Sequence, residues 1–291
     1  MQRKLKIVDV FSTRPLLGNP VAVVLDAEGL DTAAMEAIAR WTNLSETTFV
    51  LPPTVANADY RLRIFAPKGG ELPFAGHPTL GSAHALLEAG RVHVRDGRLV
   101  QESGVGLVHL TVEGDGAARR LAFELPSAAV TPLTPNDVAE LEAALGVPGK
   151  PGFVPAAVDC GPVWIVTPLS DADAVLAVQP DLVRVARLAE RLGAIGIGIF
   201  GDHAAGEAAI EVRCFAPSIG IEEDPVCGSG NGQIGLFRHL NGMIAAGGGS
   251  YVAAQGCRVG RDGKVSVTVV AEGKVWVGGA CVTTVDGTLD C

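Results

Sequence analysis

The strongest constraint on how this chain can fold is an internal repeat of one strand-like segment and the loop after it. Residues 63–67 read Arg-Ile-Phe-Ala-Pro and residues 213–217 read Arg-Cys-Phe-Ala-Pro, an offset of 150 residues. The loops that follow, 71–77 and 223–229, share a Glu, a Pro and a Gly in the same order at an offset of 152. Two consecutive matches at nearly one offset indicate a duplicated architecture. We therefore expect two related halves, each with a strand, a Pro/Gly loop and the N-terminus of a helix.

The spacing of the repeat also predicts where the domains begin and end. It places an N-terminal domain near residues 1–128 and a C-terminal domain near 129–278. The stretch 126–135 holds three prolines and little periodicity, which is typical of a domain boundary. The last strand pattern, near 275–285, is expected to return to the first half. Residues 279–291 would then belong to the N-terminal domain.

Composition excludes several classes of protein. The chain has 291 residues, 48% of them hydrophobic, and is long enough for a sizeable core. No run of 18 apolar residues predicts a membrane span, and the N-terminus lacks the apolar core of a signal peptide, so we expect a cytoplasmic protein without a membrane partner. The net charge is −9 without a basic stripe, which argues against nucleic-acid binding. Six scattered cysteines without a Cys-x-x-Cys pair argue against a zinc site or a disulfide framework.

The second copy of the loop is rich in glycine and lies between a strand pattern (209–215) and a helix pattern (233–240). A Gly-rich loop that opens a helix leaves backbone N–H groups unpaired, with the positive end of the helix dipole behind them. Such a loop can bind a small anion. Two halves that face each other would direct both helix N-termini into one cleft. The candidate anion-binding residues are Gly76, Gly228, Ser229 and Gly230. The alternative is that these glycines only form two tight turns and bind no ligand.

Glu46 is the first candidate for proton chemistry. It stands at the start of an apolar, β-branched strand pattern, directly after a turn. Desolvation by apolar walls favours the protonated carboxyl, which suits a general base near neutral pH. A solvated glutamate at the end of a strand is the simpler reading of the same pattern.

His77 and Asp224 are the next candidates, one in each copy of the loop. The ring of His77, at the entry to a helix, can shuttle a proton or donate a hydrogen bond to an anionic substrate. It can also simply cap that helix. Asp224 precedes a proline and can orient His77 or a substrate ammonium group, or cap the loop backbone. Glu222 and Glu223 are expected to be solvated.

Cys227 is ambiguous. A thiol at a Gly-rich helix N-terminus is expected to be reactive, and a thiolate can remove a proton from carbon, as in cofactor-independent racemases. A two-base racemase needs a partner thiol on the opposite face, however, and the repeat-equivalent residue is Ala75. A direct role in proton transfer and an auxiliary or silent role both stay open. The other cysteines are expected to be core or surface residues: Cys160, Cys214, Cys257, Cys281 and Cys291.

Several motifs together resemble the phenazine-biosynthesis PhzF family of isomerases. They are Asn-Leu-Ser-Glu-Thr-Thr-Phe at 43–49, the loop 71–79 and the loop 223–229. Gly-Asn-Pro-Val-Ala-Val at 18–23 and Val-Gly-Gly at 277–279 also fit. The likeness covers nearly the whole chain in the right order, so it is specific for the family rather than for one substrate.

The resemblance implies a diaminopimelate epimerase-like fold of the α+β class. It has two similar domains, each a curved mixed β-sheet wrapped around a central helix, here near 77–89 and 229–241. The resemblance also implies a cofactor-independent isomerase without a metal, often a homodimer, with its active site in the interdomain cleft. Its substrate would be a small molecule that carries a carboxylate.

The resemblance further implies a role for each site residue. Glu46 would be the general acid/base that moves a proton between carbons of a cyclic substrate, and His77 and Asp224 would assist. The substrate carboxylate would be held by Gly76, Gly228 and Ser229.

One run departs from the family pattern. The residues Cys227-Gly228-Ser229-Gly230 resemble the thiol loop of diaminopimelate and proline-type epimerases instead. An amino-acid racemase or epimerase that uses Cys227 with Glu46 or His77 is therefore the second hypothesis. A binding protein that kept the site without turnover is the third.

Overall fold

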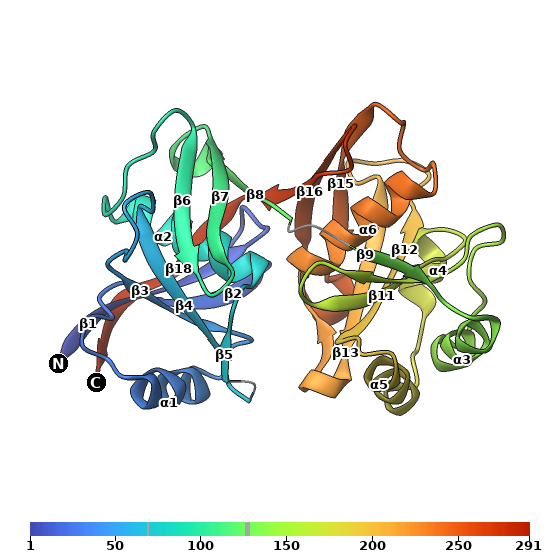
Figure 1. Cartoon of the computed structure of the whole chain (residues 1–291), viewed down its shortest axis with the longest axis horizontal. Helices are drawn as coiled ribbons and strands as arrows, with labels where there is room; N and C mark the ends of the chain where they lie inside the picture. The colour runs from blue at the N-terminus through green and yellow to red at the C-terminus, as the bar shows by residue number, and fades with distance from the viewer. Residues whose placement is uncertain (69, 126–128) are drawn as a thin grey trace. The chain divides into compact units, whose positions relative to one another are not determined.

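The structure is a computed structural model that describes residues 1–68, 70–125 and 129–291 (Figure 1). The chain divides into two compact units. The first unit comprises residues 1–124 and 278–291, and the second comprises 125–277. The predicted domain boundary between residues 128 and 129 adjoins residues 126–128, which lie outside the described residues.

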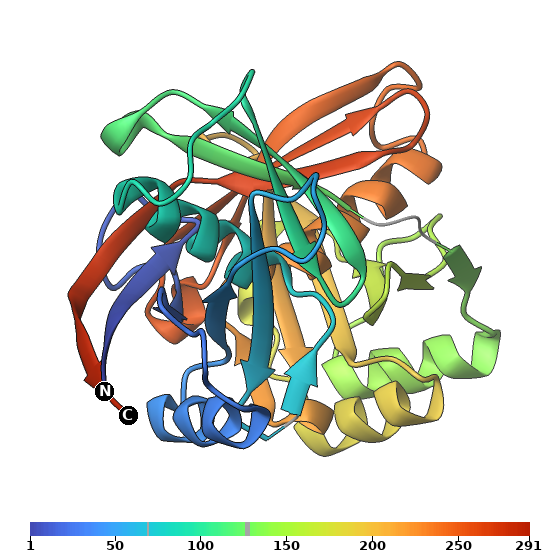
Figure 2. The same ribbon diagram turned by 60° about the vertical axis from the view of Figure 1, so that its left-hand side comes forward.

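The first unit is a mixed sheet with one helix inside its curve and one outside. Its strands are β1 (Gln2–Val10), β2 (Asn19–Val24), β3 (Thr47–Leu51), β4 (Tyr60–Ala66), β5 (Gly70–Leu72), β6 (Arg98–Ser103), β7 (Gly106–Glu113), β8 (Arg120–Glu124) and β18 (Cys281–Asp290). Its helices are α1 (Thr32–Thr42) and α2 (Gly76–Glu88). The strands pair in the order β18-β1-β2-β3-β4-β6-β7-β8, with β2–β3 and β4–β6 parallel and the other pairs antiparallel. Strands β1 and β18 run side by side to the chain termini (Figure 2).

The second unit repeats this order of strand pairing and adds two helices. Its strands are β9 (Ala129–Pro132), β10 (Ala156–Asp159), β11 (Val163–Pro168), β12 (Gly196–Asp202), β13 (Ile210–Ala216), β14 (Ile221–Asp224), β15 (Gly248–Gln255), β16 (Gly263–Val270) and β17 (Val275–Gly279). Its helices are α3 (Pro135–Leu145), α4 (Ala172–Ala177), α5 (Leu182–Arg191) and α6 (Gly228–Leu240). The order β9-β10-β11-β12-β13-β15-β16 again has two parallel pairs, β11–β12 and β13–β15. The matching pairings explain the repeat seen in the sequence.

Local signals place most helix ends. Asp31, Thr134 and Asp181 are N-caps whose side chains accept backbone N–H bonds, as their positions before apolar stripes predict. Gly146 ends α3 in the left-handed conformation that glycine adopts without a steric penalty. The central helices α2 and α6 each begin one residue before the predicted start. They are buried over most of their length, because each sheet curves around its helix.

Gly76 shows why a glycine opens α2. A Cβ there would lie 2.6 Å from the ring of Phe123 in β8, far inside van der Waals contact. The same ring makes an edge contact with Phe74, at a centroid distance of 5.4 Å. Packing against Phe123 therefore requires glycine at this position whether or not an anion binds.

The outer layers of the two units differ. In the first unit, α1 covers β3 and β4 through a cluster that includes Met35, Ile38 and Phe49. In the second, the helices α3, α4 and α5 cover a larger apolar cluster. All seven residues of β13 are buried, because helices cover one face of this strand and the curve of the sheet encloses the other. Within the described ranges, no helix is both long and apolar enough to cross a membrane.

Candidate active site

Glu46 is positioned by the end of α1. Asn43 caps this helix in the left-handed conformation, with φ of 53°, so the chain reverses within three residues and enters β3. Glu46 immediately precedes Thr47, the first residue of β3, and its side chain is 14% exposed. The buried Thr48 Oγ1 lies 2.8 Å from Ser82 Oγ, a hydrogen bond that holds β3 against α2. This contact brings the start of β3 next to the first turn of α2.

His77 is the partner that this packing brings to Glu46. Its Nε2 lies 3.3 Å from Glu46 Oε2, and the side chain is 7% exposed. Burial lowers the pKa of His77 to about 3, against a smaller opposite effect of a hydrogen bond to the backbone of Pro20. The imidazole is therefore neutral near pH 7. The contact joins a neutral ring to a carboxyl group and is not an ion pair.

The second ring nitrogen of His77 lies near β2. Its Nδ1 is 3.5 Å from Asn19 Nδ2, an amide nitrogen that can only donate, and the backbone of Pro20 also bonds the ring. The tautomer of the ring decides whether Nε2 donates to Glu46 or accepts from it. In either tautomer the 3.3 Å contact between Nε2 and Oε2 can hold one proton, as an acid/base couple requires.

Asp224 lies in the second unit at the end of β14, opposite Cys214 of β13. Its Oδ1 accepts a hydrogen bond of 3.0 Å from the backbone N–H of Val226, and its carbonyl accepts one of 2.9 Å from Gln255 Nε2. Burial raises the pKa of Asp224 to about 6, although Cys227 and the Val226 N–H oppose the shift. The group can therefore change its protonation state near neutral pH.

Cys227 is the N-cap residue of α6. Its Sγ accepts a hydrogen bond of 3.2 Å from the Gly230 N–H and lies 3.5 Å from Ser229 Oγ. Ser229 Oγ in turn accepts a hydrogen bond of 3.1 Å from Trp164 Nε1. The backbone N–H of Cys227 donates to Gln255 Oε1 over 3.1 Å. Of the predicted anion-binding groups, the Gly230 N–H is thus already bonded to sulfur.

Glu223 corrects one prediction from the sequence. Together with Glu222 it was expected to be solvated, but its carboxylate binds Arg213 in a fork of 2.9 Å and 2.8 Å. Arg213 also donates to the backbone carbonyls of Val175 and Val178, at the end of α4. The ion pair stabilises β13 and β14 under that helix.

Asn19, Trp164 and Gln255 were missed by the sequence analysis. They lie beside His77, Ser229 and Cys227, respectively. Asn19 lies in the Gly-Asn-Pro-Val-Ala-Val motif at 18–23, whereas no motif named above contains Trp164 or Gln255. A single polar residue next to a strand does not reveal which loop it will contact.

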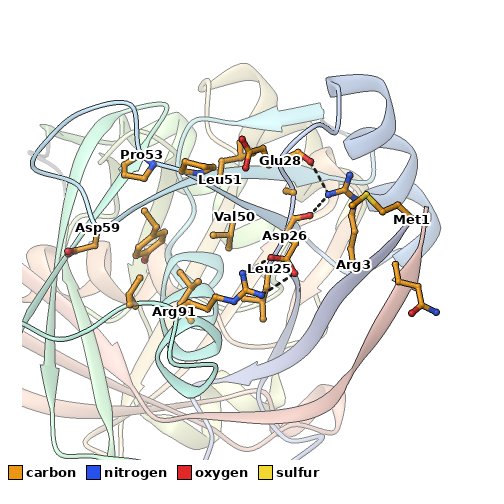
Figure 3. A pocket seen from close by; sticks show the side chains of 16 residues that line it. Met1, Arg3, Leu25, Asp26, Glu28, Val50, Leu51, Pro53, Asp59 and Arg91 are labelled. Atoms are coloured by element: carbon orange, nitrogen blue, oxygen red, sulfur yellow. Dashed lines mark hydrogen bonds and ion pairs between the residues drawn. The ribbon is translucent and has the colours of Figure 1, made fainter.

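A cavity of about 600 Å³ opens elsewhere in the first unit (Figure 3). Its wall includes Leu51, at the other end of β3 from Glu46, about 16 Å along the strand at ~3.3 Å per residue. Figure 3 shows Arg91 paired with the Asp26 carboxylate, at 2.5 Å and 3.1 Å, and Arg3 bonded to the Asp26 carbonyl. No candidate site residue lines this cavity. Within the described ranges, no three His, Cys, Asp or Glu side chains gather as a metal ion would need.

Asp224→Asn is expected to change how stability depends on pH. Because the pKa of Asp224 is about 6 in the fold and 3.8 outside it, its stabilisation is complete below pH 3.8 and is lost as the pH rises through 6. The variant lacks this loss. Between about pH 4 and about pH 7, the unfolding free energy of the variant should therefore rise relative to that of the wild type by up to about 3 kcal/mol. Urea unfolding at several pH values measures this difference.

His77→Gln should give the opposite change. Its pKa is about 3 in the fold and 6.5 outside it, so the unfolded chain binds this proton first as the pH falls below 6.5. Protonation of the unfolded chain destabilises the fold at low pH, and the variant lacks this effect. Identical pH slopes for the wild type and both variants would contradict the burial of these two groups.

Comparison with known proteins gives a consistent result over the whole chain. A family model described as phenazine biosynthesis-like protein, PhzC-PhzF, matches residues 8–287. A Schizosaccharomyces pombe protein named antisense-enhancing sequence 1 is 39% identical, over 98% of this chain and 98% of its own length. The trans-2,3-dihydro-3-hydroxyanthranilate isomerase of Pseudomonas fluorescens is 36% identical, over 88% and 86% of the two chains.

The fold also has a close match among solved structures. The phenazine biosynthesis protein of the PhzF family from Bacillus anthracis superposes with a TM-score of 0.89 over 100% of both chains, at 22% identity. This likeness confirms the fold class predicted from the sequence, two curved sheets that each enclose a helix.

Proposed function

Because the chain belongs to the phenazine biosynthesis-like PhzC-PhzF family, we propose that it is an isomerase that moves a proton between carbons of a small carboxylate-bearing substrate. The observation that supports this proposal most directly is the Glu46–His77 contact of 3.3 Å. A carboxyl group and a neutral imidazole that can hold one proton between them form an acid/base couple on a single side of a substrate. The reaction needs no cofactor in this proposal.

Glu46 takes the proton from one carbon and returns it to another. The bond that held the proton leaves its electron pair on the substrate, where an adjacent unsaturated system spreads the negative charge. His77 can exchange a proton with Glu46, because its Nε2 lies 3.3 Å from Oε2. The Glu46 side chain stays 14% exposed, so its proton can exchange with solvent before it returns, and D₂O then labels the carbon that receives it.

In the second unit, Asp224 is proposed to assist the proton transfer. Gly228 and Ser229 at the start of α6, together with Gly76 at the start of α2, are proposed to bind the carboxylate. Support comes from the helix N-termini, whose first N–H groups have no partner within the helix. That one substrate contacts residues of both units stays a prediction, as do the homodimer and the cytoplasmic location.

Turnover of trans-2,3-dihydro-3-hydroxyanthranilate in D₂O tests the proposal. The relative's name supplies this compound as the first substrate to try. Purified protein, dialysed against a chelator and supplied with no cofactor, should place solvent deuterium on a substrate carbon, as seen by NMR and mass spectrometry. If neither this compound nor related cyclic carboxylates acquire deuterium, the third hypothesis, a binding protein, is favoured.

The thiol epimerase remains the second candidate because Cys227 lies at the N-terminus of α6 beside Asp224. The matching cap of α2 is Ala75, which makes no side-chain hydrogen bond and cannot act as a second base. Incubation with proline and diaminopimelate, followed by chiral chromatography, tests this candidate. Inversion that is lost in Cys227→Ala and retained in Glu46→Gln would favour it over the proposed isomerase.

A further inference from the structure

Two cysteine sulfurs approach each other beneath the Asp224 loop. Cys214 lies on β13 and Cys227 caps α6, both in the second unit and both free thiols. A Cβ placed on Gly230 would lie 2.7 Å from Cys214 Sγ and 3.1 Å from Cys227 Sγ. The two sulfurs are therefore no farther apart than the sum of these distances. Burial raises the pKa of Cys214, and its contact with the Cys227 thiol raises it further.

Glycine at position 230 leaves both sulfurs free of a neighbouring Cβ. Any other residue at this position would place its Cβ against both sulfurs. The distance of 2.7 Å to Cys214 Sγ is shorter than real Cβ contacts allow. The segment between the cysteines carries β14 and its neighbouring loop, and Asp224 pairs with Cys214 across the two strands. A bond between the sulfurs would therefore close a short loop that contains Asp224.

The two thiols differ in their access to solvent. Cys227 is 4% exposed, whereas Cys214 is 0% exposed. A small oxidant reaches Cys227 first, and Cys214 is the nearest group that can resolve the oxidised sulfur. This is the arrangement of an attacking thiol and a resolving thiol.

We propose that Cys214 and Cys227 form a redox-active pair that a hydroperoxide converts into an intramolecular disulfide. In the first step the Cys227 thiolate attacks the terminal peroxide oxygen, so an S–O bond forms and the O–O bond breaks. The departing alkoxide takes the proton that Cys227 released and leaves as an alcohol. In the second step Cys214 attacks the sulfenic sulfur, and hydroxide leaves with the Cys214 proton as water. Both sulfurs are oxidised by one electron each, and the peroxide is reduced by two.

The disulfide would change the loop at the candidate site. It removes Cys227 Sγ from the Gly230 N–H and from Ser229, so α6 loses its cap. The disulfide also ties Cys227, at the end of the segment that contains Asp224, to Cys214 on β13. This modification does not depend on the proposed isomerase activity, because its readout is chemical.

Mass spectrometry after oxidation tests the pair. The native protein is treated with hydrogen peroxide, its remaining thiols are blocked in denaturant, and the peptides are mapped. We expect a Cys214–Cys227 cross-link, two hydrogen masses lighter than the separate peptides and reversed by dithiothreitol. In Cys214→Ser we expect a sulfenic acid on Cys227, trapped by dimedone, and no cross-link.

Gly230→Ala is the matched control, because it keeps both thiols and puts a methyl group against both sulfurs. Alanine suits the first turn of a helix, and circular dichroism checks the fold. We expect the cross-link to form about tenfold more slowly or not at all. A sulfenic or sulfinic Cys227 without a cross-link in the wild type would overturn the proposal. An unchanged rate of cross-link formation in Gly230→Ala would also overturn it. If Gly230→Ala does not fold, an equal yield of the dimedone adduct in wild type and Cys214→Ser would overturn it instead.

Discussion

Glu46→Gln is expected to fold normally, to bind substrate, and to exchange no substrate hydrogen with D₂O. Glutamine keeps the size and hydrogen-bonding reach of the side chain but cannot accept a proton from carbon. A positioned general base contributes typically ~10²–10⁴-fold in rate, so exchange should fall by at least that range. Deuterium incorporation measured by mass spectrometry gives the rate, and substrate binding measured by calorimetry shows that the site is intact.

The controls for this prediction come from the same unit. Glu36→Gln alters a glutamate on α1 that pairs with Arg40, four residues along the helix, and should leave exchange unchanged. His77→Gln keeps a hydrogen-bonding group beside Glu46 but loses the ring nitrogen that lies 3.3 Å from Oε2, so a partial loss of exchange is expected. Exchange at a near-normal rate in Glu46→Gln would falsify the assignment and move the base to His77, Asp224 or Cys227.

The second large effect is on stability, and the duplicated architecture supplies its own control. Arg213 and Arg63 occupy equivalent positions in the repeat, and each binds a glutamate, Glu223 or Glu71, through Nε and Nη2. The side chains of Arg213 and Glu223 are 6% and 11% exposed, whereas those of Arg63 and Glu71 are 17% and 41% exposed. The same ion pair is therefore buried in one unit and partly exposed in the other, mainly at Glu71.

Arg213→Met should cost about 3–5 kcal/mol of unfolding free energy, because it leaves the Glu223 carboxylate and the carbonyls of Val175 and Val178 buried without their donor. Arg63→Met should cost about 1 kcal/mol or less, since solvent screens the exposed pair. Urea unfolding followed by tryptophan fluorescence and circular dichroism measures both values.

A double variant separates the lost ion pair from lost packing. Arg213→Met combined with Glu223→Leu removes the unpaired carboxylate and should recover part of the stability. Equal losses in Arg213→Met and Arg63→Met would show that burial does not distinguish the two pairs. No recovery in the double variant would show that the Arg213 side chain stabilises mainly by packing on Phe215, 4.9 Å from the ring centroid.

Much of the fold could be predicted because its signals are local. The N-caps Asp31, Thr134 and Asp181 act on N–H groups two or three residues away. The stripe of Met35, Ile38 and Ala39 predicts which face of α1 is buried. The resemblance to the PhzF family rested on loops 71–79 and 223–229 and is confirmed by the family match.

The candidate site was predicted in part. The sequence singled out Glu46 and His77 separately, and the structure places them 3.3 Å apart. The sequence could not show that these two residues meet, because they are 31 positions apart and their contact depends on how β3 packs against α2. Asn19 and Trp164 were missed for the same reason, since each meets its partner across a strand and a helix.

By itself the sequence determined the duplication, the caps and turns, the apolar faces and the family. Each of these depends on contacts within one turn or one strand, or on motifs read in order. Only the tertiary structure decided that Arg213 is buried while Arg63 is not, that Glu223 is paired, and that Cys214 faces Cys227. These outcomes depend on which layers cover each strand. The helix α4 supplies carbonyls to Arg213, and Gly230 leaves room for two sulfurs, so burial and proximity arise from segments that the chain order alone does not bring together.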